Sequence, residues 1–198
     1  MDRSTLRPLG PRPLVLPLPA VLVATWNADG TANAMTAAWA TSCCQEPPCV
    51  GVAVRENRLT YANILARGAF TLAVPPTSLA RQVDYLGIVS GKREPDKLER
   101  LGLRTAPGPC ADSPLLLDCR VNVACRLVQQ LALGTHTWFV GQVMEVHADP
   151  GCVREDGTLD IAAVDPLAYA SSASAYHGLG PALGKAFSIG KERSPRLG

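Results

Sequence analysis

The chain is organised around the stretch from Asn33 to Val50, which reads NAMTAAWATSCCQEPPCV. A strand that is buried in a core is usually richer in Val, Ile and Leu than this stretch is. Small residues instead allow the backbone to approach a flat or anionic ligand, because little projects beyond Cβ. One reading is therefore a hairpin strand with a polar outer face, and the other is a strand and loop that contact a cofactor.

Several side chains in this stretch suit a ligand. Donors and acceptors of hydrogen bonds are present at Asn33, Thr36, Thr41 and Ser42, and Trp39 offers a face for stacking. A hairpin leads into it, with a strand predicted over 20–26, a tight turn at Asp29-Gly30 and a second strand over 31–38.

Short motifs follow one another along the chain in a fixed order. They are the hairpin over 21–39, Thr60-Tyr61-Ala62-Asn63-Ile64, Ser90-Gly91-Lys92, Gly134-Thr135-His136-Thr137 and the C-terminal run over 184–190. On these motifs the chain resembles the flavin reductase-like, FMN-binding split-barrel family, and within it the flavoredoxin branch. The resemblance covers the chain from about Pro19 to Lys191.

The resemblance implies a mainly β fold, a six-stranded antiparallel split β-barrel with peripheral helices. The domain would span residues 19–198 after an irregular lead-in over 1–18, and it would form a homodimer with FMN bound noncovalently at a shared site. The pattern of the chain agrees with this class, since strands joined by hairpins with short helices inserted imply an antiparallel barrel with helices outside.

The remaining elements are predicted from periodicity and from breaker residues. Strands are expected over 49–54, 69–74 and 135–147 and from Leu115 onward, and helices over 60–67, 77–86 and 94–101, the first and last ended by Gly68 and Gly102. Cys119 and Cys125 are expected on one side of a strand as small buried hydrophobes.

Binding of the FMN phosphate is predicted at the start of the first helix. Arg58, Thr60 and Asn63 offer a cation and polar groups there, and Thr41 and Ser42 come from the preceding loop. The alternative is a capped surface helix with Thr60 as its N-cap.

By resemblance, the flavin ring would contact Asn33, Met35, Thr36, Trp39 and Cys43. Lys92, or Lys97 in its place, would stabilise the reduced ring, which tends to carry negative charge near N1. Phe187 would close over the site. The alternative roles are a solvated surface charge for either lysine and core packing for Phe187.

His136 is the candidate catalytic residue. No Ser-His-Asp set can be assembled from the three histidines, and a lone histidine is more often structural than catalytic. His136 stands out because it matches the family's Gly-x-His motif, where it would reach the flavin or the nicotinamide.

Composition excludes several other classes. The formal net charge is +2 with no run of Lys or Arg longer than a pair, which argues against nucleic acid as a partner. The 7 cysteines form no C-x-x-C pair, so no metal site is expected, and a reducing cytoplasm suits them. The N-terminus imitates a signal peptide, but Pro17 and Pro19 interrupt its apolar run, and no membrane association is expected.

The predicted function is an FMN-dependent oxidoreductase in which NADH or NADPH delivers hydride to flavin N5. The alternative is a flavoredoxin-like electron carrier that a redox protein partner reduces. A third possibility is a barrel that has lost its flavin. The polar residues of the opening stretch and His136 argue against this possibility. Nothing in the sequence distinguishes NADH from NADPH, because no Rossmann unit is present.

Overall fold

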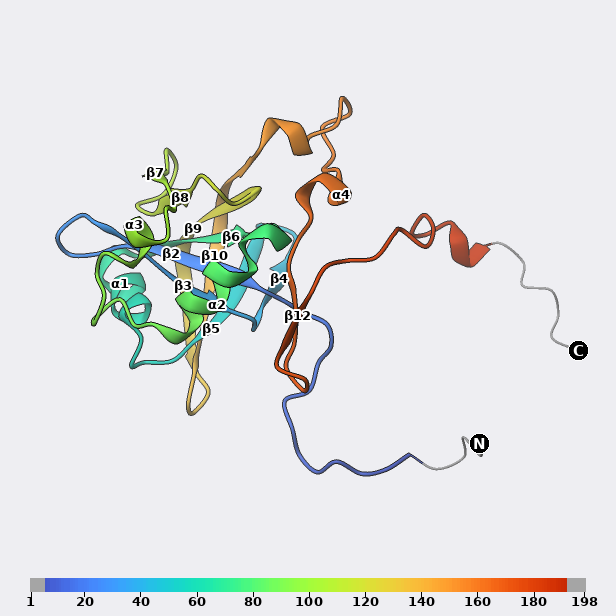
Figure 1. Cartoon of the computed structure of the whole chain (residues 1–198), viewed down its shortest axis with the longest axis horizontal. Helices are drawn as coiled ribbons and strands as arrows, with labels where there is room; N and C mark the ends of the chain where they lie inside the picture. The colour runs from blue at the N-terminus through green and yellow to red at the C-terminus, as the bar shows by residue number, and fades with distance from the viewer. Residues whose placement is uncertain (1–5, 192–198) are drawn as a thin grey trace, which may run out of the picture.

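The computed structural model describes residues 6–191, and their centre is one curled antiparallel sheet (Figure 1). The sheet has seven strands in the order β3-β2-β6-β9-β10-β5-β4. Along the chain these are β2 (Val21–Trp26), β3 (Ala32–Ala37), β4 (Ala40–Cys44), β5 (Cys49–Val54), β6 (Ala69–Val74), β9 (Val121–Ala132) and β10 (Thr137–Ala148). The predicted antiparallel split-barrel class with outer helices is confirmed. The sheet is open, however, and has one strand more than the six that were predicted.

The additional strand is β4, which occupies the part of the opening stretch expected to be a loop. It pairs only with β5, and its register is irregular between Ser42 and Cys44. Ala40 is buried while the four residues after it are exposed. An edge strand has a neighbour on one side only and tolerates polar residues on both faces. Residues 41–44 therefore extend the sheet instead of forming a loop.

Short helices pack against the sheet, and their ends differ from prediction in two places. They are α1 (Leu59–Arg67), α2 (Ala80–Ile88), α3 (Lys97–Arg100) and α4 (Ile161–Val164). As predicted, α1 ends at Gly68, whose φ of 63° is left-handed. Helix α3 is shorter than predicted and is followed by Gly102, whose φ is 68°. Thr60 is not the N-cap: Arg58 is, because Thr60 lies buried in the first turn.

The predicted helix start at Thr77 is also wrong. Residues Thr77–Leu79 form a separate 3-10 turn before α2. The Thr77 hydroxyl donates to the carboxylate of Asp165 and is not used as a helix cap. The turn is thereby tied to a segment almost ninety residues further along the chain, a contact that local sequence does not encode.

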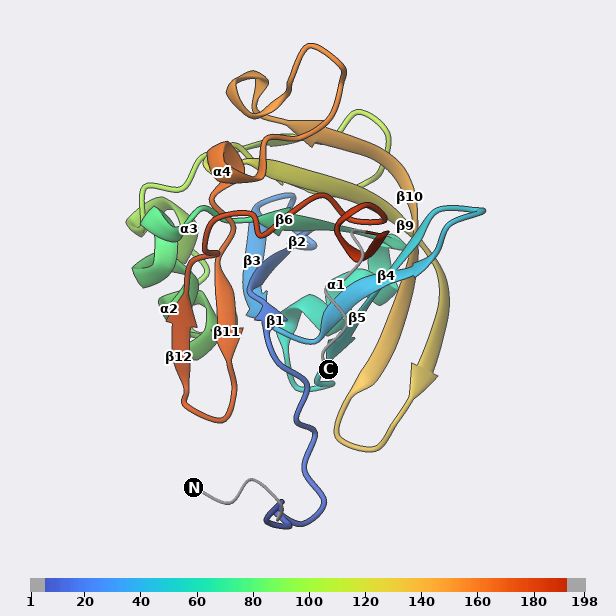
Figure 2. The ribbon, with the colours of Figure 1, turned by 90° about the vertical axis from the view of Figure 1, so that its right-hand side faces the viewer.

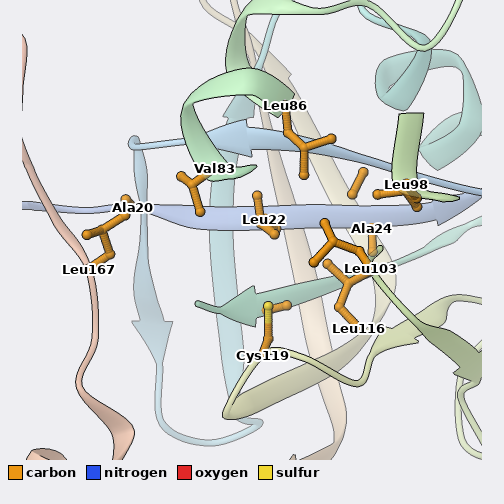
Figure 3. Packing of buried hydrophobic residues seen from close by; sticks show 12 residues of the cluster. Ala20, Leu22, Ala24, Val83, Leu86, Leu98, Leu103, Leu116, Cys119 and Leu167 are labelled. Carbon is orange, nitrogen blue, oxygen red and sulfur yellow. The ribbon is translucent and has the colours of Figure 1, made fainter. Parts of the chain in front are cut away.

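Strand β2 is buried on both of its faces. Leu22 and Ala24 point outward and pack beneath α2 and α3 (Figure 3). Val23 faces the inside of the curl, where it belongs to a second cluster with Phe70 and Phe139. A strand covered on both sides needs a continuous apolar run, and this explains the sequence of β2, VLVATW.

The two buried cysteines lie in different clusters. Cys119 packs with Leu22 on the outer side, whereas Cys125 packs with Phe70 inside the curl. Burial raises the pKa of each thiol to about 12, so the prediction of buried hydrophobic cysteines is confirmed. The prediction that they share one side is wrong, because Cys119 precedes β9 and does not follow its alternation.

The remaining strands form two small sheets at the periphery. A hairpin joins β7 (Thr105–Pro107) and β8 (Pro114–Leu116), and a three-stranded sheet joins β1 (Leu18–Pro19), β11 (Ala168–Ala170) and β12 (Ala175–His177). Two further 3-10 turns cover Pro150–Cys152 and Ile189–Lys191. The chain leaves the body beside this three-stranded sheet at both ends (Figure 2).

Both terminal segments carry exposed apolar side chains. Val15 is 69% exposed, and Leu183 and Phe187 are 92% and 94% exposed. Large apolar groups that remain in water at this level commonly mark a surface that is covered in the functional assembly. Within residues 6–191, no helix is long and apolar enough to cross a membrane.

A buried amide fastens α1 to the hairpin of β2 and β3. The Asn63 amide nitrogen donates to Thr25 Oγ1 at 3.1 Å and to Asn27 Oδ1 at 2.8 Å. Arg67 completes the network by donating to the Asn27 carbonyl at 2.6 Å. The polar groups of this network lie out of water, so each depends on the others for its hydrogen bonds.

We expect Asn63→Ala to lower the free energy of unfolding by about 1–3 kcal/mol, since it leaves buried acceptors without a donor. Urea denaturation of the wild type and the variant measures this difference. The exposed Asn57 provides the control, and Asn57→Ala should change stability by less than about 0.5 kcal/mol. Equal losses in the two variants would contradict the structural role of the buried network.

Candidate functional site

A cavity of about 300 Å³ opens where three distant segments of the chain meet. One wall is the end of β3 with the residues that follow it, from Met35 to Trp39. The second is the end of β5 with Arg55, and the third is His136 with Tyr169 of β11. The topology brings them together, since β3 and β5 are joined through the short edge strand β4 and β10 lies beside β5.

The cavity narrows into a cleft at the other end of β3. The cleft, of about 10 Å³, shares Met35 and Arg58 with the wider cavity, and it is also lined by Asn33, Leu59, Thr60, Val89, Ser90, Gly91 and Lys97. Cavity and cleft together are called the slot below. The slot follows the extended chain of β3 from Asn33 to Ala37 and continues past the bend at Ala38 to Trp39.

The narrow end of the slot depends on a glycine and a buried hydrogen bond. A Cβ on Gly91 would lie 2.3 Å from Asn33 Oδ1, so only glycine allows the loop before α3 to approach β3 this closely. Asn33 Nδ2 donates to Thr60 Oγ1 at 2.9 Å. Thr60 acts as an acceptor in this bond, which leaves the hydrogen of its hydroxyl able to donate to a ligand.

Two positive charges meet at this narrow end. Lys97 is 2% exposed, and its Nζ donates to the Val89 carbonyl at 3.1 Å. Burial, and next the charge of Arg58, lower the pKa of Lys97 to about 8, while Glu94 acts in the opposite direction. A buried cation beside a second cation is unfavourable without an anion, and the slot provides the space for one.

The nearest carboxylate does not neutralise this pair. Glu94 Oε2 accepts a hydrogen bond from Arg100 at 2.6 Å and another from the Tyr85 hydroxyl at 2.6 Å. Its charge is therefore already matched by Arg100. The arrangement is suited to a ligand that brings its own negative charge to Lys97 and Arg58.

Aromatic rings border the wide end of the slot. The rings of Trp39 and His136 have centroids 4.7 Å apart at an interplanar angle of 44°. Arg55 Nε donates to His136 Nε2 at 3.4 Å, and the Thr135 hydroxyl lies 2.9 Å from Nδ1. Burial, followed by the charge of Arg55, lowers the pKa of His136 below its usual 6.5. The imidazole is therefore neutral at pH 7 and can donate or accept a hydrogen bond.

The structure places most of the predicted site residues in the slot. Seven of the thirteen candidates line it, namely Asn33, Met35, Thr36, Trp39, Arg58, Thr60 and His136. The Thr36 hydroxyl also donates to the carbonyl of Val83 in α2, which ties β3 to that helix. Of the two lysines that were considered, Lys97 lines the slot, whereas Lys92 lies in a neighbouring groove.

The other candidates lie elsewhere. Thr41, Ser42 and Cys43 are exposed on β4. Asn63 is committed to the buried network of α1, and Phe187 extends from the body on the C-terminal segment. The predicted phosphate set of Arg58, Thr60 and Asn63 with Thr41 and Ser42 is thus not brought together in one place.

Sequence reasoning missed Arg55 and Tyr169. Arg55 directly follows a predicted strand. A cation at the end of a strand is the signal that could have identified Arg55 as a site residue. Tyr169 lies on β11, which follows α4. No sequence motif around Tyr169 indicates that its side chain reaches the slot. All seven cysteines are free thiols, and residues 6–191 contain no group of three His, Cys, Asp or Glu side chains placed to hold a metal ion.

Comparison with known proteins identifies close relatives. Residues 14–178 match the family model described as flavin reductase like domain. Flavoredoxin of Desulfovibrio vulgaris (Miyazaki F) is 41% identical and superposes with a TM-score of 0.89 over 94% of this chain and 100% of that chain. Flavoredoxin from Methanosarcina acetivorans is 26% identical, with a TM-score of 0.86 over 94% of this chain and 98% of that one. An uncharacterised protein of Archaeoglobus fulgidus is 35% identical over 129 residues, which are 65% of this chain and 71% of that protein.

The lowered pKa of Lys97 makes the stability of the ligand-free protein depend on pH. The pKa of Lys97 is about 8 in the folded protein, compared with its ordinary value of 10.5. Between these two pH values, Lys97 of the unfolded chain holds a proton that Lys97 of the folded chain has lost. The free energy of unfolding should therefore rise with pH in this window. Lys97→Met should remove the rise and stabilise the ligand-free protein at pH 7 by roughly 1–3 kcal/mol.

Urea denaturation at pH 7 to 10 tests this, with Lys92→Met as the control because Lys92 is exposed. The control should keep the pH dependence of the wild type. Equal slopes for the wild type and Lys97→Met would show that Lys97 is not perturbed in the folded protein.

Proposed function

The chain belongs to the flavin reductase like domain family, and on that premise we propose that it is an FMN-binding flavoprotein oxidoreductase that accepts hydride from NADH or NADPH. The observation that carries the proposal is the slot, in which a buried lysine and an arginine line a narrow polar cleft that has no carboxylate among its lining residues. A flat cofactor with negative charge on its polar edge suits such a cleft.

In this proposal, the narrow end of the slot would take the pyrimidine edge of the flavin ring. That edge presents carbonyl oxygens and ring nitrogens, for which Asn33, Thr60 and Lys97 supply an amide, a hydroxyl and an ammonium group. The first backbone N–H groups of α1 lie at the same end, since Leu59 and Thr60 open the helix. Arg55 and Arg58 in the wider cavity are available for the phosphate.

Lys97 would also set the electron affinity of the cofactor. FMN, when bound, supplies the redox chemistry, and the chain orients it and holds its charge. Negative charge near N1 would be stabilised by the Lys97 ammonium and by the N-terminus of α1. Because Lys97 loses its proton readily in the free protein, an arriving anion would raise its pKa again and bind together with a proton at pH 8 to 9.

The wide end offers room for the nicotinamide. Hydride transfer needs donor and acceptor atoms about 3–3.5 Å apart, which requires an open face of the ring. His136 lies at this end as a neutral imidazole held by Arg55 and Thr135, and it would hold the carboxamide by a hydrogen bond. Trp39 and Tyr169 border the same opening and would keep water from the reacting face.

The second candidate function is an electron carrier reduced by a protein partner. The 41% identity to the flavoredoxin of Desulfovibrio vulgaris favours it. The two functions share the flavin site and differ in whether a nicotinamide reaches the ring. A reductase shows fast hydride transfer, whereas a carrier is reduced slowly by nucleotides and rapidly by dithionite or by a reduced protein.

Stopped-flow bleaching of the flavin band with NADH, NADPH and dithionite distinguishes these functions. For a reductase, we expect His136→Ala to slow reduction by the nucleotide on the order of 10- to 100-fold through loss of positioning. The affinity for FMN should change little, because the proposed contacts of His136 are with the nicotinamide. Ser171→Ala serves as the control, since Ser171 borders the same cavity without a proposed contact.

Slow bleaching of the wild type by both nucleotides, with rapid reduction by dithionite, would assign the protein as a carrier. Protein that is purified without colour and does not quench the fluorescence of added FMN would contradict both functions.

We further propose that the protein is a homodimer in which each subunit helps to close the other's flavin site. The N-terminal segment from Pro13 to Pro19 lines an apolar groove of about 400 Å³ with Trp39 and Trp138, directly beside the slot. The C-terminal segment, whose apolar side chains are exposed, leaves the body on this side (Figure 2). Phe187 could thus cover the slot of the partner subunit, in place of its predicted role over its own.

Light scattering should give twice the chain mass of 20.9 kDa. Phe187→Ala should weaken the dimer and FMN binding together, whereas Ser188→Ala should leave both unchanged. A monomer that binds FMN as tightly as the proposed dimer would contradict the shared site.

A further inference from the structure

A second groove lies on the outer side of the loop that leads from α2 to α3. Its volume is about 500 Å³, and its lining residues are Asn57, Arg58, Ile88, Val89, Ser90, Lys92, Arg93 and Glu94. This set is called the outer groove below. It touches the slot directly, because Arg58, Val89 and Ser90 line both the outer groove and the narrow end of the slot.

The outer groove is positively charged. Arg58, Lys92 and Arg93 contribute three cations, and Glu94 is the one carboxylate among the lining residues. The charge of Glu94 is already matched by Arg100, with the Tyr85 hydroxyl as a second partner. A ligand that fills this groove should therefore carry more than one negative charge, as a phosphate monoester does.

The cations are presented by a loop of defined shape. The Ser90 hydroxyl accepts a hydrogen bond from the backbone nitrogen of Lys92 at 3.2 Å, and the Ser90 carbonyl accepts from Arg93 at 2.9 Å and from Glu94 at 3.1 Å. The turn that these bonds form holds Lys92 and Arg93 side by side at the surface. Little backbone order has to be gained when an anion binds.

An apolar side chain stands beside the cations. Ile88, the last residue of α2, is 72% exposed and forms part of the groove wall. A flat base could cover it while the phosphate next to that base reaches Lys92 and Arg93. A base linked to phosphates is what the adenosine end of a nicotinamide dinucleotide presents, and the shared wall places this end next to the flavin slot.

The charges also distinguish the two dinucleotides. In Rossmann folds, a carboxylate accepts hydrogen bonds from the ribose hydroxyls of NADH, whereas a cation lies at the 2′-phosphate of NADPH. This fold has no Rossmann unit, but the same charge complementarity between a phosphate and a cation holds at any site. The outer groove has two exposed cations and no carboxylate that is free of a partner. We infer that the outer groove binds the 2′-phosphorylated adenosine end of NADPH, so that NADPH is the preferred electron donor. This inference rests on the proposed function, since it assigns the donor of that reaction.

Calorimetric titration of the FMN-loaded protein with 2′,5′-ADP and with 5′-ADP tests the groove without turnover. We expect 2′,5′-ADP to bind at least tenfold more tightly than 5′-ADP, and its affinity to fall as salt is added. The double variant Lys92→Ala/Arg93→Ala should lose on the order of 10- to 100-fold in affinity for 2′,5′-ADP. Its FMN spectrum should remain that of the wild type, because neither residue lines the slot.

The matched control is Arg126→Ala/Arg154→Ala, which removes the same charge from two exposed positions outside the groove. It should bind 2′,5′-ADP as the wild type does. Equal affinity for the two nucleotides, absence of binding, or equal losses in the two double variants would overturn the inference. Absence of binding would also result if the FMN phosphate itself filled the groove. Failure of the proposed function has a different signature: colourless protein, or flavin that NADPH does not reduce although 2′,5′-ADP binds.

Discussion

Strand β2 has no face in contact with water, and the arrangement of the functional residues follows from this constraint. Its outward side chains support α2 and α3, and its inward side chains fill the curl of the sheet. Its hairpin partner β3 is the edge strand of the sheet, so one long side of β3 is free to border a ligand. Two side-chain bonds then hold this edge in place: Asn33 bonds to Thr60 of α1, and Thr36 bonds to the Val83 carbonyl of α2.

One short connection between α2 and α3 serves two electrostatic tasks. Gly91 brings this loop against Asn33, and the chain then turns so that the Lys97 side chain enters the protein while Lys92 and Arg93 remain in solvent. The buried ammonium has a lowered pKa and responds to charge on a bound ring. The exposed pair is suited to attracting a phosphate from solution.

The order of the motifs was sufficient for the fold, because the five short motifs occur in the order found in a single family. It also predicted those site residues that share β3 or the start of α1. The differences have physical causes. Thr60 has the composition of a helix cap, which was the alternative reading, but its hydroxyl oxygen accepts a hydrogen bond from Asn33, twenty-seven residues earlier in the chain. By resemblance Cys43 was expected near the ring, whereas the structure has it exposed on the edge strand β4. Tyr169 reaches the slot only through tertiary folding, which no local pattern records.

The departure of both chain ends beside the slot has a practical consequence for electrochemistry. A protein tethered to an electrode through an added tag at either end would turn the wide end of the slot towards the support, since the N-terminal segment and Trp39 line one groove. Cys110 offers another anchor, because its thiol is exposed on the connection between β7 and β8. That hairpin lies on the opposite side of the body from the two points where the described terminal segments leave it (Figure 1). Attachment there, with the exposed Cys43 and Cys44 replaced by serine, would leave the slot open to dissolved nucleotides.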